Sequence, residues 1–165
     1  MVRAEWAIFE EDFWAINNVL EDLRKSSKSG NVMLIDRTGQ LVSQCGQNVE
    51  FDLTSFASLC AADFEANYQL AKLIGEKDFS TLYHQGARES MFLGKIARGV
   101  VLVVLFDKGT TLGLVRLRVK RAVEELNGII EGLYDKLKYR NEEYDAFDES
   151  FTREVEAEID NLFAD

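Results

Sequence analysis

The side chains that could perform chemistry are few and scattered along this chain of 165 residues. The single histidine, His84, cannot build a histidine-rich zinc site, and the two cysteines, Cys45 and Cys60, do not stand at metal-ligand spacing. The glycine-containing run Gly109–Val115 lacks the lysine that a Walker phosphate loop requires. We therefore expect no catalytic residue, no metal site and no cofactor.

Charged residues offer two further candidates. The acidic pairs Glu10–Glu11 and Glu124–Glu125 could in principle form a general acid–base dyad, but both lie in segments with helical spacing and polar outer faces. The basic run Arg116–Arg121 is predicted to be a solvated helix face. Docking of an acidic partner surface on that run is the alternative.

The net charge of −10 is unevenly distributed. Residues 138–165 carry ten acidic and three basic side chains, so residues 1–137 have a net charge of only −3. Such a chain repels phosphate backbones, which argues against nucleic-acid binding. No apolar stretch reaches membrane-spanning length, and residues 1–12 contain acids where a secretory signal needs an apolar run, so we expect a cytoplasmic protein.

The elements that position these residues follow from the hydrophobic pattern. Val100–Phe106 is an uninterrupted apolar run that predicts a central strand buried on both faces, and Leu112–Leu137 follows it with helical spacing. Upstream, the pattern predicts a helix over residues 9–23, a hairpin over 31–44, a helix from Asp52 or Thr54 to Gly75, and a second hairpin over 79–97. This order predicts an α/β (α+β) fold with a mainly antiparallel sheet covered on both faces.

The helix that ends at Gly75 carries two apolar stripes. The stripe predicted to pack on the sheet comprises Phe56, Leu59, Cys60, Ala66, Leu70 and Leu73. The other stripe comprises Ala57, Ala61, Phe64, Tyr68 and Ala71. A surface helix needs only one stripe, so the second predicts a contact with another protein. The polar strand that contains Thr81 and Tyr83 is predicted to be a sheet edge, where a further chain can pair.

The order of elements resembles the Roadblock (dynein light-chain type) family. Several segments are similar to its MglB-type members, which regulate the Ras-like GTPase MglA: LIDRTGQLVSQCG, ASLCAADFEANYQLAKLIGE, FSTLYHQGARESMFL, VVLVVLFD, TTLGLVRLRVKRA and the C-terminal IDNLFAD. The resemblance implies a three-layer fold, in which a five-stranded, mainly antiparallel sheet has one helix on one face and two on the other.

The resemblance also implies a function. It implies a homodimer that acts as a GTPase-activating protein of a Ras-like, MglA-type GTPase in cell polarity and motility control. Such a protein supplies no arginine finger and repositions residues of the GTPase, so it is not itself an enzyme. The GTPase would contact Ala61, Glu65, Tyr68, Gln69 and Lys72. The dimer would form through Ala57, Phe64, Thr81 and Tyr83.

Two alternatives stay open. The family tends to have small residues at the positions that face the GTPase, whereas this chain has Glu65, Tyr68 and Gln69. A bulky or charged group costs about 1–3 kcal/mol there if it is unpaired, which favours a scaffold or adaptor without GTPase-activating activity. A small-molecule sensor, with space near Gly94 and Gly99, is the other alternative.

After Leu137 the apolar pattern breaks. The sequence therefore predicts a Roadblock-like domain over residues 1–137 and an acidic, largely disordered tail over 138–165 that could end in a short helix. The tail is either a solubilising extension or a tethered arm. As an arm, it would dock on the GTPase or another partner through Ile159, Leu162 and Phe163.

Overall fold

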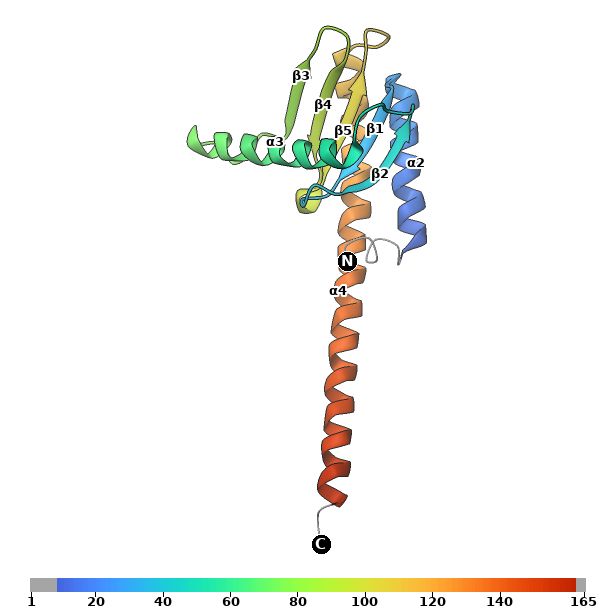
Figure 1. Cartoon of the computed structure of the whole chain (residues 1–165), viewed down its shortest axis with the longest axis vertical. Helices are drawn as coiled ribbons and strands as arrows, with labels where there is room; N and C mark the ends of the chain where they lie inside the picture. Colours follow the sequence, from blue (N-terminus) through green and yellow to red (C-terminus); the bar gives the residue numbers. More distant parts are fainter. Residues whose placement is uncertain (1–8, 163–165) are drawn as a thin grey trace. The chain divides into compact units, whose positions relative to one another are not determined.

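A computed structural model describes residues 9–162, including all side chains except those of residues 143–149 and 158–162. The chain divides into two compact units between Glu131 and Gly132, and the first unit contains the whole sheet (Figure 1). The elements in chain order are α2 (Glu10–Ser27), β1 (Asn31–Ile35), β2 (Leu41–Gly46), α3 (Leu53–Leu73), β3 (Thr81–Gln85), β4 (Ser90–Lys95), the 3-10 turn η1 (Ala97–Gly99), β5 (Val101–Phe106) and α4 (Leu112–Leu162).

The five strands form one antiparallel sheet in the order β2-β1-β5-β4-β3. β5 is the central strand, and its Val104 lies opposite Val32 of β1 and Phe92 of β4. Residues Val101–Val104 are at most 3% exposed, because helices cover both faces of the sheet. This confirms the buried central strand and the antiparallel sheet predicted from the apolar run.

The helices make the fold three layers thick (Figure 1). α3 lies across one face of the sheet, and α2 and α4 lie on the other. A Cβ added at Gly94 of β4 would lie 3.4 Å from Val119 and 3.6 Å from Val123, so α4 packs closely over this strand. The predicted layers are confirmed.

The turn between β1 and β2 is held by one carboxylate. Oδ1 of Asp36 accepts hydrogen bonds from Thr38 N at 2.8 Å, Thr38 Oγ1 at 2.6 Å and Gln40 N at 3.0 Å. Gly39 in this turn has a φ of 86°, and a Cβ added to it would lie 2.9 Å from Cα of Ser58 on α3. The turn therefore touches α3 and helps to position its first half.

Replacing Asp36 by alanine is expected to lower the free energy of unfolding by about 1–3 kcal/mol, because two backbone N–H groups lose their acceptor. The side chain is 5% exposed, so water cannot fully replace it. Urea denaturation measures the change. Asp36→Asn keeps an acceptor oxygen and should lose less, and unchanged stability in Asp36→Ala would contradict the role given to this turn.

Both ends of α3 form as the sequence predicts. Asp52 caps the start by accepting a hydrogen bond from Thr54 N at 3.1 Å. At the other end, Gly75 has a φ of 82°, and the N–H of Glu76 donates to the carbonyl of Ala71 at 2.9 Å. This is the glycine-based stop known as a Schellman motif, and it fixes where α3 ends.

α4 differs from the prediction. It continues to Leu162, whereas the charge pattern predicts an acidic, largely disordered tail from residue 138. Residues 133–162 contain no glycine and no proline, and they are rich in Glu, Lys, Arg, Ala and Leu, which have high helix propensity. The high charge of this segment therefore did not end the helix. The first compact unit ends at Glu131, before the predicted boundary at Leu137.

Candidate interaction surface on helix α3

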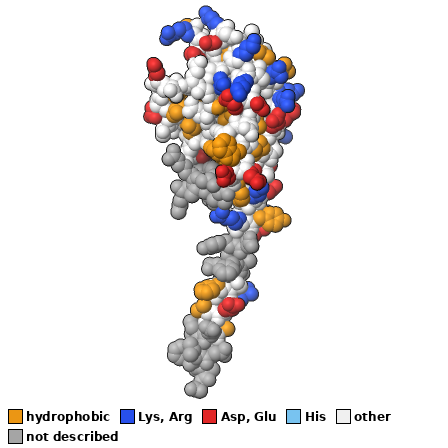
Figure 2. Space-filling model, turned by 90° about the vertical axis from the view of Figure 1, so that its right-hand side faces the viewer, with side chains coloured by type: hydrophobic (Ala, Val, Ile, Leu, Met, Phe, Trp, Pro, Cys, Tyr) orange, Lys and Arg blue, Asp and Glu red, His pale blue; other side chains and the backbone are white. Residues whose placement is uncertain are grey.

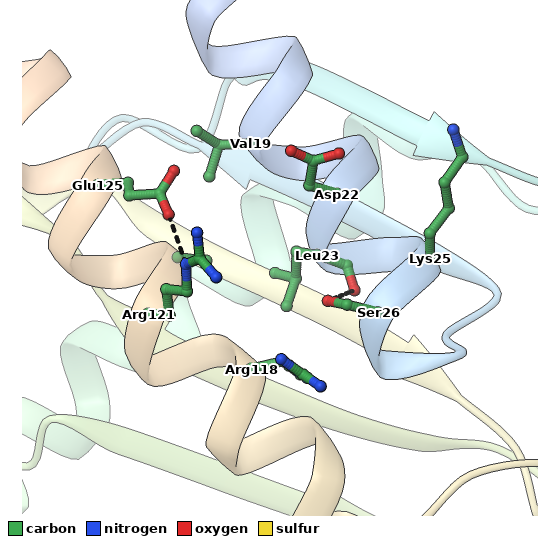
Figure 3. A pocket seen from close by; sticks show the side chains of 9 residues that line it. Val19, Asp22, Leu23, Lys25, Ser26, Arg118, Arg121 and Glu125 are labelled. Carbon is green, nitrogen blue, oxygen red and sulfur yellow. Dashed lines mark hydrogen bonds and ion pairs between the residues drawn. The ribbon is translucent and has the colours of Figure 1, made fainter.

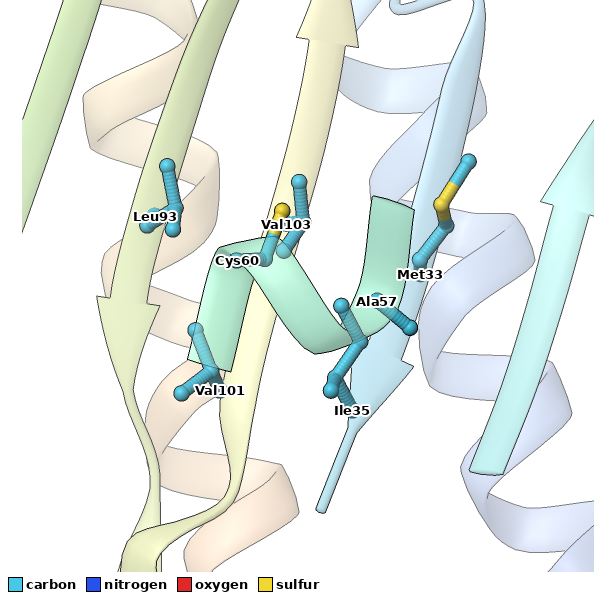
Figure 4. Packing of buried hydrophobic residues seen from close by; sticks show 7 residues of the cluster. All are labelled: Met33, Ile35, Ala57, Cys60, Leu93, Val101 and Val103. Carbon is cyan, nitrogen blue, oxygen red and sulfur yellow. The ribbon is translucent and has the colours of Figure 1, made fainter. Parts of the chain in front are cut away.

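The inner face of α3 packs on the sheet. Ala57 and Cys60 are 1% and 3% exposed and lie against Met33, Ile35 and Val103 (Figure 4). Four partly buried side chains of α3 pack against the same cluster: Leu53, Phe56, Ala61 and Phe64. These positions recur every three or four residues, so they form one stripe along the helix.

The opposite face of α3 carries a second apolar stripe that is open to solvent. Leu59, Leu70 and Leu73 are 69%, 57% and 83% exposed, and Ala62 and Ala66 between them are exposed as well. We call these five residues the outer stripe. Large exposed apolar side chains gathered on one helix face mark a surface for another molecule.

The C-terminal end of α3 extends past the edge of the sheet, beyond β3 (Figure 1). Leu73 lies in this overhang, next to Ile74, which is 70% exposed. No strand of the described part of the chain lies beneath the overhang. Its apolar side chains are therefore open to solvent in the single chain.

β3 is an edge strand, as predicted, and it pairs only with β4 within the described sheet. Thr81 is exposed, and Tyr83 is 37% exposed with its ring stacked on Phe106 at a centroid distance of 6.2 Å. The backbone on the outer side of β3 is thus available for pairing with another strand.

One side-chain hydrogen bond joins this edge strand to α3. His84 Nε2 lies 2.7 Å from Oδ2 of Asp63. The two side chains are 48% and 38% exposed, so the pair is worth about 1 kcal/mol at most. Among the side chains that the structure describes, no group of three His, Cys, Asp or Glu residues is arranged to hold a metal ion.

Comparison with known proteins identifies the family of this chain. The Roadblock/LC7 domain matches residues 15–106, from within α2 to the end of β5. The chain belongs to the Roadblock/LC7 family. No curated protein sequence matches it.

Several solved structures share the Roadblock/LC7 fold of this chain. Myxococcus xanthus MglB is 47% identical, with a TM-score of 0.72, over 76% of this chain and 95% of that one. The gliding protein MglB of Thermus thermophilus is 31% identical, with a TM-score of 0.70, over 73% of this chain and 92% of that one. A structure described as MglB with tetrameric arrangement is also 31% identical, with a TM-score of 0.70, over 74% and 92%.

The sequence prediction for the two stripes of α3 in this Roadblock/LC7 chain is right only in part. Phe56 and Cys60 pack on the sheet as predicted, whereas several other members of the two stripes lie on the opposite side of the helix from the one predicted. The sequence predicts both Ala57 and Phe64 at a dimer interface. Ala57 is buried in the core, where it cannot contact a partner, and Phe64 is half-buried there. Three leucines predicted to pack on the sheet face solvent instead: Leu59, Leu70 and Leu73. Both stripes are apolar, so periodicity could not decide between them. Ala57, Cys60 and Ala71 on the inner face are small, which lets α3 approach the sheet there.

The residues predicted to contact a GTPase lie on different sides of α3. Glu65 and Gln69 are exposed, and Gln69 Nε2 donates to Glu65 Oε1 at 2.7 Å. Tyr68 is half-buried, with Nζ of Lys72 4.4 Å from its ring centroid. Ala61 packs toward the core. Only Glu65, Gln69 and Lys72 therefore remain as exposed neighbours of the outer stripe.

A cavity of about 350 Å³ lies beside the inner edge of α3. It is lined by Phe64, Glu65 and Tyr68 of α3 and by Gly99 near the start of β5. The space predicted near Gly99 is thus present. Gly94, by contrast, faces α4 on the other side of the sheet.

Both cysteines are poorly placed for nucleophilic chemistry. Burial raises the pKa of Cys60 to about 11, and burial together with the nearby Glu21 carboxylate raises the pKa of Cys45 to about 12. About one thiol in a thousand or fewer is then ionised at pH 8. We expect a thiol reagent to label both slowly in the folded protein and rapidly after unfolding in urea. Rapid labelling of the folded protein would contradict this.

The surface charges are mixed in sign. Figure 2 shows a face on which acidic and basic side chains are interspersed, whereas binding to a nucleic-acid backbone needs a continuous basic patch. Over residues 9–162, no helix combines the length and the apolar character that a bilayer crossing requires.

Proposed function

We propose that this Roadblock/LC7 protein is a cytoplasmic, homodimeric regulator that activates GTP hydrolysis by a Ras-like GTPase of the MglA type, in the control of cell polarity and motility. The observation that carries the proposal is the outer stripe of α3, an exposed apolar surface on a chain 47% identical to an MglB. A surface of this kind binds proteins and needs no catalytic group of its own.

The proposed dimer uses the overhang of α3 and the edge of the sheet together. Two copies related by a two-fold axis can pair β3 with β3, which joins the two sheets edge to edge. Each overhang then extends toward the partner's α3, and Leu70 and Leu73 lose their exposure to water in the contact between the two helices. An MglB relative with a tetrameric arrangement supports self-association in this family.

The proposed GTPase contact uses the first part of the outer stripe. Leu59 supplies apolar area, and the small side chains of Ala62 and Ala66 allow a partner backbone to come close. A partner that binds the GTP-bound conformation more tightly shifts the switch loops toward that conformation. Alignment of the attacking water by the GTPase's own residues then speeds hydrolysis.

A scaffold without GTPase-activating activity is the second candidate. Exposed Glu65 and Gln69 border the outer stripe and favour it, because a docking GTPase must desolvate them. The hydrogen bond between Gln69 and Glu65 already satisfies one polar group of each side chain, which lowers the cost of desolvating them. We therefore prefer the GTPase-activating role to the scaffold role.

The end of α4 is a further part of the proposal. Ile159 and Leu162 belong to α4, but their side chains and all of Phe163 lie outside the described residues. We propose that this end is a tethered arm that docks on the GTPase and raises its local concentration. Deleting residues 158–165 should then weaken GTPase binding without changing the stability of the sheet-containing unit.

Single-turnover GTP hydrolysis by a purified Ras-like GTPase of the same organism, with and without this protein, tests the proposal. We expect acceleration of at least about tenfold, no hydrolysis by this protein alone, and tighter binding to the GTPase loaded with a GTP analogue than with GDP. Binding without acceleration would support the scaffold. Binding to neither state would overturn both candidates.

A further inference from the structure

A second cavity, of about 430 Å³, lies between α2 and α4 on the sheet face opposite α3. Its floor is apolar and buried, since Val19, Leu23 and Ala122 are 9%, 3% and 4% exposed. Charged side chains from both helices surround the hollow (Figure 3). The volume falls in the range of small-molecule sites, about 300–1,000 Å³.

Arg118 is the group in this cavity that the fold leaves unsatisfied. Its Nε is buried, and no hydrogen-bond acceptor for it lies within the described part of the chain. The guanidinium extends from α4 toward the C-terminal end of α2, near Ser26 (Figure 3). The neighbouring Arg121, by contrast, donates to Glu125 at 3.0 Å. A buried donor without an acceptor is unfavourable, so an acceptor that enters the cavity gains more here than at an exposed arginine.

The charges around the cavity indicate which chemical class of hydrogen-bond acceptor can bind there. Two basic side chains, Arg118 and Arg121, face two acidic ones, Asp22 and Glu125, whereas the ammonium of Lys25 points away from the cavity and lies 3.4 Å from Glu21. Because Arg121 is paired with Glu125, Arg118 is the basic side chain at the cavity that has no ion-pair partner among the described residues. A carboxylate carries one negative charge, and its planar pair of oxygens matches the planar donors of arginine. A phosphate dianion would bring a second negative charge close to two carboxylates, which is unfavourable.

We propose that this cavity binds a small organic monocarboxylate. The carboxylate accepts hydrogen bonds from Nε and one terminal nitrogen of Arg118, and the apolar body of the ligand packs on Val19, Leu23 and Ala122. Because α3 lies on the other face of the sheet, this site does not depend on the dimer or on the GTPase contact.

Titration of the full chain with sodium 3-methylbutanoate tests the proposal, with the Nε–H signal of Arg118 followed by NMR. We expect a saturable shift of that signal. The uncharged analogue 3-methylbutanamide should not produce the shift, and inorganic phosphate should not compete for the site. Arg118→Lys keeps the positive charge but loses the planar donors, so it should weaken binding by about tenfold or more, as judged from backbone amide signals around the cavity.

Arg116→Lys is the matched control, because Arg116 is an exposed arginine on the same helix. It should bind 3-methylbutanoate like the unaltered chain. A shift that does not saturate, an equal response to the amide or to phosphate, or equal binding by Arg118→Lys would overturn the proposal. Backbone amide spectra show whether each variant is folded, and Arg118→Gln provides a second test if Arg118→Lys is not.

Discussion

Replacing Leu70 and Leu73 together by glutamate is expected to convert the protein from a dimer into a monomer. The two leucines are 57% and 83% exposed in the single chain, so the substitutions should cost the monomer little. In the proposed dimer they would place unpaired carboxylates in an apolar contact, and the two-fold axis doubles the effect. Each lost leucine alone removes about 1.5–3 kcal/mol of burial, so the dissociation constant should rise by about 1,000-fold or more.

Sedimentation velocity over a range of concentrations measures this change. Leu117→Glu is the matched control, because Leu117 is also an exposed leucine on a helix, at 63%, but lies on α4. It should leave the dimer intact. A double variant of α3 that still sediments as a dimer would show that the overhang is not part of the interface.

Replacing Ala66 by arginine is expected to remove most of the stimulation of GTP hydrolysis, a loss of about tenfold to a hundredfold. Ala66 is exposed in the middle of the outer stripe, where a long charged side chain keeps a partner backbone at a distance. Arginine has a high helix propensity, so α3 itself should remain stable.

Single-turnover GTP hydrolysis by the Ras-like GTPase measures the loss of stimulation in Ala66→Arg. Ala87→Arg, at an exposed alanine in the turn between β3 and β4, is the control and should keep full stimulation. Sedimentation of both variants shows whether the dimer survives. Undiminished stimulation by Ala66→Arg would contradict the proposed GTPase contact.

Much of the sheet could be predicted because its signals have few competing interpretations. An uninterrupted, β-branched apolar run such as Val100–Phe106 fits little except a strand covered on both faces. The ends of α3 were predictable for a similar reason. Asp52 and Gly75 act on the local backbone, and such effects do not depend on the rest of the fold.

The orientation of α3 could not be predicted, because it depends on packing between distant segments. Both of its stripes are apolar, and only the shape of the sheet surface decides that Ala57 and Ala71 lie inward while Leu59 lies outward. The overhang depends in addition on the width of the sheet relative to the length of the helix.

The cavity between α2 and α4 could also not be predicted from the sequence. Arg118 belongs to a basic run that predicts a solvated face, and the run alone gives no sign that one nitrogen is buried. That burial arises only when α2, far away in the chain, packs beside α4. The continuation of α4 was missed for a different reason, because the high charge of residues 138–162 predicts disorder, although these residues contain no glycine or proline and many are good helix formers.

The central claim is that the outer stripe of α3 binds a GTPase in its GTP-bound state. Methyl NMR of the leucines tests it most directly, with the Ras-like GTPase added in its GTP-analogue and GDP forms. The account predicts that the methyl signals of Leu59 shift with the GTP-analogue form and little with the GDP form, while those of Leu117 stay unchanged. Unchanged Leu59 signals in a complex that forms, or equal shifts with both nucleotides, would contradict it.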